Sequence, residues 1–346
     1  MDELILQNIT PWPWYFLLPS ILGLLLVLGW AADMLVSEAV VLSERAQIPK
    51  IVIGATIVSL GTTMPETAVS VFAAIQGQPD LALGNAVGSI ICDTGLILGI
   101  ACLISPLPLP KRIVNRQGWL QLLAGVLLVL VCWPFSASWS EISEGTAHGN
   151  MPQWVGFIFL GLLALYLWTS ARGARRERNG STNLEDFEED ASAPVGIVIV
   201  KLIIGIVVVL ATSKVLIPIV RVAAERMGVP EAVISASLVA FGTSLPELVT
   251  CVTAARRGHG ELAVGNVVGA DILNVLFVTG AAAAVTREGL TVGPRFYTLL
   301  FPAMLLILVT FRIGILMSPE KLSRKFGVLL LALYILTMIF LPGGVH

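Results

Sequence analysis

Two glutamates, Glu66 and Glu247, lie in otherwise apolar sequence, and each directly follows a proline. A charged side chain at the depth of a bilayer costs roughly 2.5 to 3.5 kcal/mol on insertion scales, so such residues usually have a function. The surroundings of both glutamates repeat, because residues 54–99 align without a gap on residues 235–280 at a constant offset of 181, with 18 of 46 positions identical. This repetition predicts a paired cation site.

The prolines before the two glutamates predict helix breaks. Pro65 and Pro246 lack an amide hydrogen and clash with the carbonyl four residues earlier, at Gly61 and Gly242. Backbone oxygens released there need partners that lipid cannot supply, and a hard cation can be such a partner.

Other polar side chains follow helical spacing around each break and therefore share a helix face. They are Ser59, Thr62 or Thr63, Glu66 and Ser70 in the first copy; Thr243 or Ser244 and Glu247, with Ala240 and Cys251 at the serine positions, in the second copy; and Asn85, Ser89, Asp93, Asn266 and Asn274 in the spans that follow. An environment of carboxylate, hydroxyl, amide and carbonyl oxygens suits calcium or sodium and does not suit zinc or copper.

The composition is that of an integral membrane protein. The chain is 56% hydrophobic and 13% charged, with a mean hydropathy of +0.88, whereas soluble domains average about 25% charged residues. Three scattered histidines and four cysteines in apolar stretches argue against a histidine metal site and a disulfide framework. The sequence has no basic cluster interleaved with aromatic residues, which argues against nucleic-acid binding. It also has no HExxH or GxSxG motif, which argues against an enzyme.

Ten apolar stretches of about 20 residues predict an all-α protein with ten transmembrane helices. They are residues 14–38, 48–76, 79–104, 117–135, 153–171, 194–222, 230–256, 261–285, 293–313 and 325–342. A polar linker at 172–193 divides the chain into a first five-helix repeat, 1–171, and a second, 194–346. Its basic beginning and acidic end predict a solvated, flexible tether.

An odd number of spans in each half makes the second half enter the bilayer from the opposite side, which predicts inverted-topology repeats with a binding site at the midplane. With the amino terminus outside, the inward connections hold fifteen lysines and arginines and the outward ones hold four. This bias favours outside termini and a cytoplasmic linker in the cell membrane, the inner membrane of a bacterium.

The repeated motifs resemble a known family. GTTMPE at 61–66 with GNAVGSIICD at 84–93, and GTSLPE at 242–247 with GNVVGADILN at 265–274, are similar to the two repeats of the calcium/cation antiporter superfamily, in particular its sodium/calcium exchanger branch of prokaryotic type. The resemblance implies alternating-access exchange of Ca²⁺ for Na⁺ without a cofactor, in which the first and sixth spans slide against the core.

The resemblance also implies roles for single residues. Glu66 and Glu247 are the main calcium ligands, and Asp93 and Asn274 are polar groups at the middle of the site. The carbonyls come from Thr62 and Thr243, and the sodium-binding hydroxyls come from Thr63, Ser89 and Ser244. The less firmly assigned positions are Asp271, Asn85, Asn266, Ser59 and Ala240.

The second copy departs from the family pattern. Better-known exchangers tend to carry asparagine where this chain has Asp93 and aspartate where it has Asn274, and Ala270 replaces a usual serine. Asp271 replaces a common asparagine and lies one helical step away, so it faces either the ions or a neighbouring helix. The driving ion and its stoichiometry therefore stay open, with proton-coupled and potassium-dependent exchange as alternatives. A passive cation channel and an intramembrane enzyme are weaker ones.

Two further charged residues inside predicted spans, Asp33 and Lys214, are separated by the same offset of 181. They pair with neighbouring charges, extend along the helix toward water or, as a weaker alternative, act directly in transport.

Overall fold

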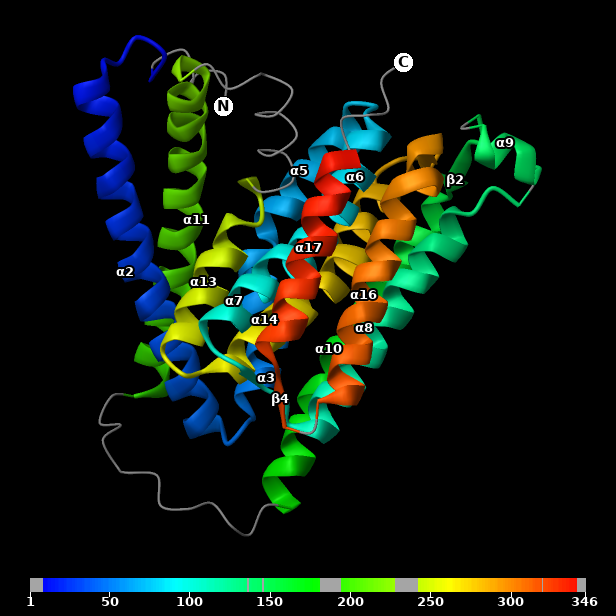
Figure 1. Ribbon diagram of the computed structural model, residues 1–346. Helices are drawn as coiled ribbons and strands as arrows, with labels where there is room; N and C mark the ends of the chain where they lie inside the picture. Colours follow the sequence, from blue (N-terminus) through cyan, green and yellow to red (C-terminus); the bar gives the residue numbers. More distant parts are fainter. Residues whose placement is uncertain are drawn as a thin grey trace.

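The computed structural model describes residues 9–135, 137–144, 146–180, 194–227, 242–318 and 320–340. Helices dominate it (Figure 1). In the first half they are α2 (Trp14–Ala46), α3 (Lys50–Ile53), α4 (Ser59–Thr62), α5 (Met64–Ile75), α6 (Pro79–Ile90), α7 (Leu98–Ile104), α8 (Lys111–Cys132), α9 (Trp139–Ser143) and α10 (Gln153–Gly180). In the second half they are α11 (Val195–Arg226), α13 (Leu245–Arg256), α14 (Gly260–Leu273), α15 (Gly280–Ala284), α16 (Phe301–Met317) and α17 (Arg324–Phe340).

Segments of π-helix interrupt these helices. They are η1 (Gly54–Val58), η2 (Ile91–Ile97), η3 (Asn274–Thr279) and η4 (Phe296–Leu300). Such turns are rare in proteins and occur frequently at functional sites. The apolar periodicity of the sequence did not indicate them.

Within these described ranges, seven helices are long and apolar enough to cross a membrane, or eight when the bent pair of 50–62 and 64–75 is one span. The predicted third span, 79–104, agrees with α6, η2 and α7 taken together. Residues 228–241, which include the first 12 residues of the predicted seventh span, lie outside the described part, and the last predicted span is the 17-residue α17. The count of ten spans therefore stays a prediction.

Two helices are longer than predicted. Helix α2 continues past residue 38 to Ala46, and Glu38 within it pairs with Lys201 of α11. Helix α10 continues to Gly180, nine residues into the predicted linker. The alanines, arginines and glutamate of 171–178 are good helix formers, so the flexible tether predicted for 172–193 is wrong for this part. Residues 181–193 lie outside the described part.

The long helices α2 and α11 lie side by side at one edge of the molecule (Figure 1). They come close together at Gly205, where an added Cβ would lie 3.1 Å from the Cα of buried Leu35. Helix α2 also packs against α3 and α13, and α11 packs against α4 and α13. The pair therefore borders the part of the core that carries both glutamates.

Short ladders join the two halves of the chain. β1 (Leu107–Pro108) pairs antiparallel with β4 (Lys321–Leu322), and β2 (Gly149–Met151) pairs antiparallel with β3 (Leu290–Val292). Each ladder takes one strand from each half, so the loops at the ends of the bundle are tied across the repeats.

The helix that follows each glutamate-bearing helix returns through a glycine turn. Gly77 and Gly258 have φ angles of 72° and 80°, a region that residues with a Cβ rarely adopt. Helix α5 therefore packs antiparallel on α6, and α13 packs antiparallel on α14. These two hairpins place the glutamates beside the asparagine-bearing helices.

The buried centre of the protein is α14, which needs its glycines for close packing. A Cβ at Gly269 would lie 2.5 Å from the Cα of Ala55, and one at Gly265 would overlap the backbone of Ile51. Gly265 and Gly269 form a GxxxG pair, a pattern that lets membrane helices approach closely. By the repeat offset of 181, the partners of the equivalent pair, Gly84 and Gly88, fall at 232–236, outside the described residues.

Candidate ion-binding site

Both glutamates lie in the first turn of a helix that begins after a break. Helix α4 ends at Thr62, α5 begins at Met64, and the two parts of this span are bent by 45°. In the second copy α13 begins at Leu245. The proline is the second residue of each new helix, where its missing amide costs no intrahelical hydrogen bond.

Neither glutamate is neutralised by a basic side chain in the described part of the chain. Glu66 and Glu247 are each 1% exposed. The ion pairs found there involve other residues, and both carboxylate oxygens of Glu66 and the Oε2 atom of Glu247 accept no hydrogen bond. A buried polar group without a hydrogen-bond partner destabilises the fold by about 1 to 3 kcal/mol, and a charged carboxylate without a partner costs more. These oxygens therefore need a cation or a proton.

Side chains of the two repeats meet directly around the glutamates. The hydroxyl of Thr63 donates to Oε1 of Glu247 at 3.4 Å, and the hydroxyl of Thr243 donates to Oδ1 of Asn85 at 3.3 Å. Asn85 in turn donates through Nδ2 to the backbone oxygen of Glu66 at 3.1 Å. Residues more than 150 positions apart in sequence thus form one polar network.

The threonines at the two breaks also cross between repeats. Thr243 lies near the Glu66 carboxylate without a hydrogen bond to it, and its repeat equivalent Thr62 lies near Glu247. The negative charge of Glu247 acts on Glu66, so the two carboxylates lie within electrostatic range of each other.

The aspartate and the asparagine of the following spans meet each other. Asn274 donates through Nδ2 to Oδ2 of Asp93 at 3.4 Å, and these two positions are repeat equivalents. Both lie in π-helical turns, η2 and η3, and both are 1% exposed. Oδ1 of each residue accepts no hydrogen bond from the described residues. Asp93 also lies within electrostatic range of Glu66.

Asp271 is held by a neighbouring helix. Its Oδ2 accepts hydrogen bonds of 2.5 Å from the hydroxyl of Thr94 and from Nε2 of Gln121 on α8. Its charge still acts on Asp93, and its Oδ1 accepts no hydrogen bond from the described residues. Thr94 and Gln121 are not among the residues predicted from the sequence. Gln117 and Gln121, four residues apart in an apolar span and both buried, were the signal that could have indicated this face.

The remaining predicted residues are buried near this cluster. Ser59, Ser89, Ser244 and Asn266 are at most 1% exposed. The hydroxyls of Ser89 and Ser244 and both polar side-chain atoms of Asn266 have no hydrogen-bond partner among the described residues. The hydroxyl of Thr62 donates to its own helix, at the backbone oxygen of Ser59. Ala240 lies outside the described residues.

Hydroxyl, amide and backbone oxygens would have to complete any cation site here. Within the described ranges, no group of three or more histidine, cysteine, aspartate or glutamate side chains is arranged to hold a metal ion by itself. Two glutamates within electrostatic range of each other, with buried serine, threonine and asparagine oxygens nearby, form a hard, all-oxygen environment. Such an environment can bind calcium or sodium.

Comparison with known proteins agrees with this chemistry. The family model described as "Sodium/calcium exchanger protein" matches residues 16–172 and 197–342. The inner membrane protein YrbG of Escherichia coli strain K12 is 33% identical over 314 residues, covering 90% of this chain and 91% of its own length. The sodium/calcium exchanger MaX1 of Methanosarcina acetivorans is 29% identical and covers 93% of this chain and 97% of its own.

A solved structure is similar over nearly the whole chain. The sodium-calcium exchanger NCX_Mj, soaked with 10 mM Na⁺ and no Ca²⁺, superposes with a TM-score of 0.77 at 26% sequence identity. The superposition covers 94% of this chain and 98% of that one. The similarity therefore extends beyond the repeated motifs to the arrangement of the helices.

Proposed function

Because the chain belongs to the sodium/calcium exchanger family, we propose that it exchanges Ca²⁺ for Na⁺ across the cell membrane by alternating access. The observation that carries the proposal is the pair of buried, repeat-equivalent glutamates whose carboxylate oxygens lack partners among the described residues. Two carboxylates balance the charge of one Ca²⁺, and sodium ions can balance the same charges by occupying overlapping oxygens.

The proposed architecture has ten spans in two inverted repeats, 1–171 and 194–346, joined by the connection at 172–193. Helix α11 begins at Val195, 181 residues after α2 begins at Trp14, which is the offset of the repeated motifs. The family model also matches one segment in each half. Inverted repeats of this kind place the transport site near the bilayer midplane. The lysine and arginine bias supports outside termini and a cytoplasmic linker.

Glu66 and Glu247 are the proposed Ca²⁺ ligands from the two halves. Backbone oxygens of Thr62 and Thr243, at the helix breaks, complete the calcium coordination. The proposed sodium ligands include the hydroxyls of Thr63, Ser89 and Ser244. Asp93 and Asn274 are the proposed polar groups at the middle of the site. The contact of Thr63 with Glu247 supports this assignment, because one ion position can then use oxygens of both repeats.

Charge balance explains why such a site exchanges ions and does not leak. An empty site holds bare carboxylates away from water, and this desolvation is costly. With Ca²⁺ or Na⁺ bound, the charge is neutralised, and α2 and α11 can move across the core to open the site to the opposite face. Return without an ion is disfavoured, so movement of one ion is coupled to movement of the other.

The acidic groups beside the glutamates favour a second candidate, exchange that also moves a proton or K⁺. Asp93 and Asp271 add two buried carboxylates, and Asp271 acts electrostatically on Asp93. One Ca²⁺ cannot neutralise four carboxylates, so a further monovalent cation would stabilise the loaded site.

Calcium flux into proteoliposomes separates these functions. Purified protein is reconstituted, and ⁴⁵Ca²⁺ uptake is measured with an outward Na⁺, K⁺ or H⁺ gradient imposed separately. We expect concentrative uptake with the Na⁺ gradient alone. Uptake driven by a pH gradient without sodium would support the proton-coupled candidate, and uptake that never exceeds equilibrium under any gradient would indicate a channel.

A further inference from the structure

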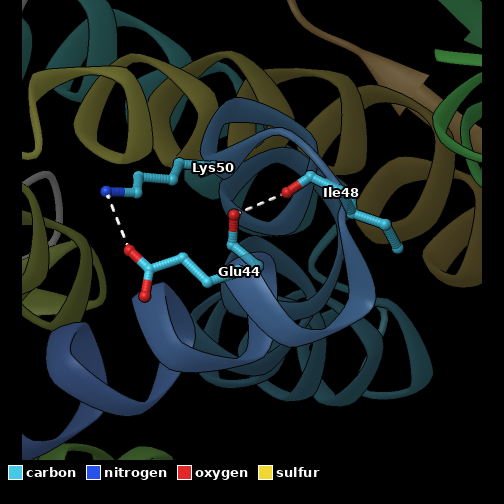
Figure 2. Close-up of polar contacts among 4 residues, drawn as sticks. Glu44, Ile48 and Lys50 are labelled. Carbon is cyan, nitrogen blue, oxygen red and sulfur yellow. Dashed lines mark hydrogen bonds and ion pairs between the residues drawn. The ribbon is translucent and has the colours of Figure 1, made fainter. Parts of the chain in front are cut away.

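The end of α2 is braced by polar contacts. Figure 2 shows Lys50 pairing with Glu44 at 3.4 Å across the turn into α3. The hydroxyl of Ser43 donates to the backbone oxygen of Ile48 at 2.5 Å, and the turn passes through Gln47 at a φ angle of 53°. A left-handed backbone at a residue with a Cβ persists where surrounding contacts over-determine it. This turn is therefore fixed in place.

An ion pair also joins α2 to the core. Asp33 on α2 accepts from Arg257, the residue that follows α13, at a distance of 2.8 Å. The side chains are 50% and 41% exposed, and α2 packs against α13 and α3 around this contact. The mirrored helix pair, α11 with α5, has no comparable interface in the part of the chain that the structure describes.

None of these contacts can form at the equivalent positions of the second repeat. Adding 181 to Asp33 gives Lys214, and subtracting it from Arg257 gives Gln76, so this pair has lost its opposite charges.

At the mirrored turn, Ser43 is replaced by Ala224, and the pair of Glu44 and Lys50 is replaced by Glu225 and Glu231, two residues of the same charge. Glu225 instead pairs with Arg221 on its own helix. The position of Gln47 is held by Gly228; Gly228 and Glu231 lie outside the described residues.

We propose that these contacts, Asp33 with Arg257 together with the braced turn at 43–50, form a latch present in one repeat only, which biases the exchanger toward the conformation with the end of α2 docked on α13. The inference rests on the proposed function, because it requires two conformations that inverted repeats interconvert. Asp33 and Arg257 are then positioning residues that set the sidedness of the exchanger. They do not bind the ions.

The inverted repeats explain why one latch biases the equilibrium. In the mirrored conformation the end of α11 docks on α5, and the end of α2 leaves α13. Asp33 then loses Arg257, and the newly facing pair, Lys214 and Gln76, gives no charge attraction in return. Exposed ion pairs are weak, so we expect the latch to shift the ratio of the two conformations only about two- to fivefold.

A matched control exists within the moving pair. Lys201 of α11 pairs with Glu38 of α2 at 3.3 Å, so this ion pair links two helices that move together. Breaking it with Lys201→Gln removes an ion pair that is 50% exposed at the lysine and 13% exposed at the glutamate. Because α2 and α11 move together, the distance between α11 and α5 of the core should not respond.

The test measures the two conformations directly by pulsed electron paramagnetic resonance. Spin labels go on cysteines introduced at Val220 of α11 and Ile75 of α5, which are 40% and 62% exposed. The four native cysteines are fully buried and do not compete for the label. We expect two distances, with the longer one dominant in the parent protein.

Asp33→Asn should raise the short-distance population about two- to fivefold. The reversed pair, Asp33→Arg with Arg257→Asp, should restore the dominant long distance of the parent protein. Installing the missing latch, with Lys214→Asp and Gln76→Arg, should favour the short distance in the parent background.

Unchanged populations in Asp33→Asn, or an equal shift in Lys201→Gln, would overturn the latch. The proposed function fails separately: sodium-driven calcium uptake absent from liposomes while the distances respond as expected would retain the latch and reject the exchange assignment.

Discussion

The two copies of the repeat differ more in what supports the glutamate than in the glutamate itself. In the first copy Ser70 donates to the backbone of Ala82 at 2.9 Å, and Asn85 donates to the Ser70 hydroxyl at 3.0 Å. In the second copy Cys251 makes only a 3.8 Å contact with Ala263, and Asn266 has no partner among the described residues. The glutamates stay equivalent because they would share one ion, whereas the hydrogen bonds behind them are local and can diverge.

The glutamates should respond equally to substitution if they share the ion. Glu66→Gln and Glu247→Gln should each lower sodium-driven calcium uptake at least about 100-fold, equal to about 2.7 kcal/mol, because each removes a charge that an ion must balance. Uptake of ⁴⁵Ca²⁺ into sodium-loaded proteoliposomes measures this. Glu144→Gln, at an exposed glutamate, is the control. Near-normal uptake in either variant, with the protein folded, would break the equivalence.

The close packing of α14 provides a stability test. Gly269→Ala should destabilise the protein by about 1 to 3 kcal/mol, because the new Cβ would lie 2.5 Å from the Cα of Ala55 and 2.6 Å from the Ser59 hydroxyl. Thermal unfolding in detergent measures the loss. Gly161→Ala, with nothing within 4 Å of its added Cβ, should not lower the midpoint, because alanine favours a helix over glycine. Equal midpoints for the two variants would contradict the packing described here.

The negative charge of Asp93 should be transferable to its repeat equivalent, Asn274. Asp93→Asn should weaken Ca²⁺ binding about tenfold, or 1.4 kcal/mol, because a carboxylate near Glu66 is lost. Since Asp93 and Asn274 contact each other, adding Asn274→Asp should restore most of the affinity. Isothermal titration of the purified variants measures both steps. A double variant as weak as Asp93→Asn would show that the two positions are not interchangeable.

The missing hydroxyl of the second copy should be replaceable. Cys251→Ser gives Asn266 the partner that Ser70 gives Asn85, and we expect a gain of about 0.6 kcal/mol, typical of a hydrogen bond in a membrane protein. The reciprocal change, Ser70→Cys, should lose a similar amount. Opposite shifts of the unfolding midpoint would support the comparison, and shifts of the same sign would refute it.

Much of this arrangement could be predicted from the sequence. Proline chemistry located the breaks, and they occur as expected between Thr62 and Met64 and before Leu245. The repeat located the residues that the structure brings together, including Asp93 with Asn274. The polar side chains that helix spacing grouped in the first copy are all buried: Ser59, Thr62, Thr63, Glu66 and Ser70.

Other features had no usable signal in the sequence. The π-helical turns at Asp93 and Asn274 depend on packing, and no residue preference marks them. Gln121 could not be connected with Asp271, because contacts between non-adjacent spans are set by the tertiary fold. The pairing of Asp33 with Arg257 likewise depends on how α2 docks, although the opposite charges of the two residues permitted it.

The most direct test of the central claim is an experimental structure with a bound ion. Crystals soaked in Ca²⁺ or its heavier analogue Sr²⁺ are measured for anomalous scattering. We expect a single strong peak between the two halves, with carboxylate oxygens of both Glu66 and Glu247 at roughly 2.3 to 2.6 Å for Ca²⁺. A peak bound by only one of the two glutamates, or located away from both, would contradict the account.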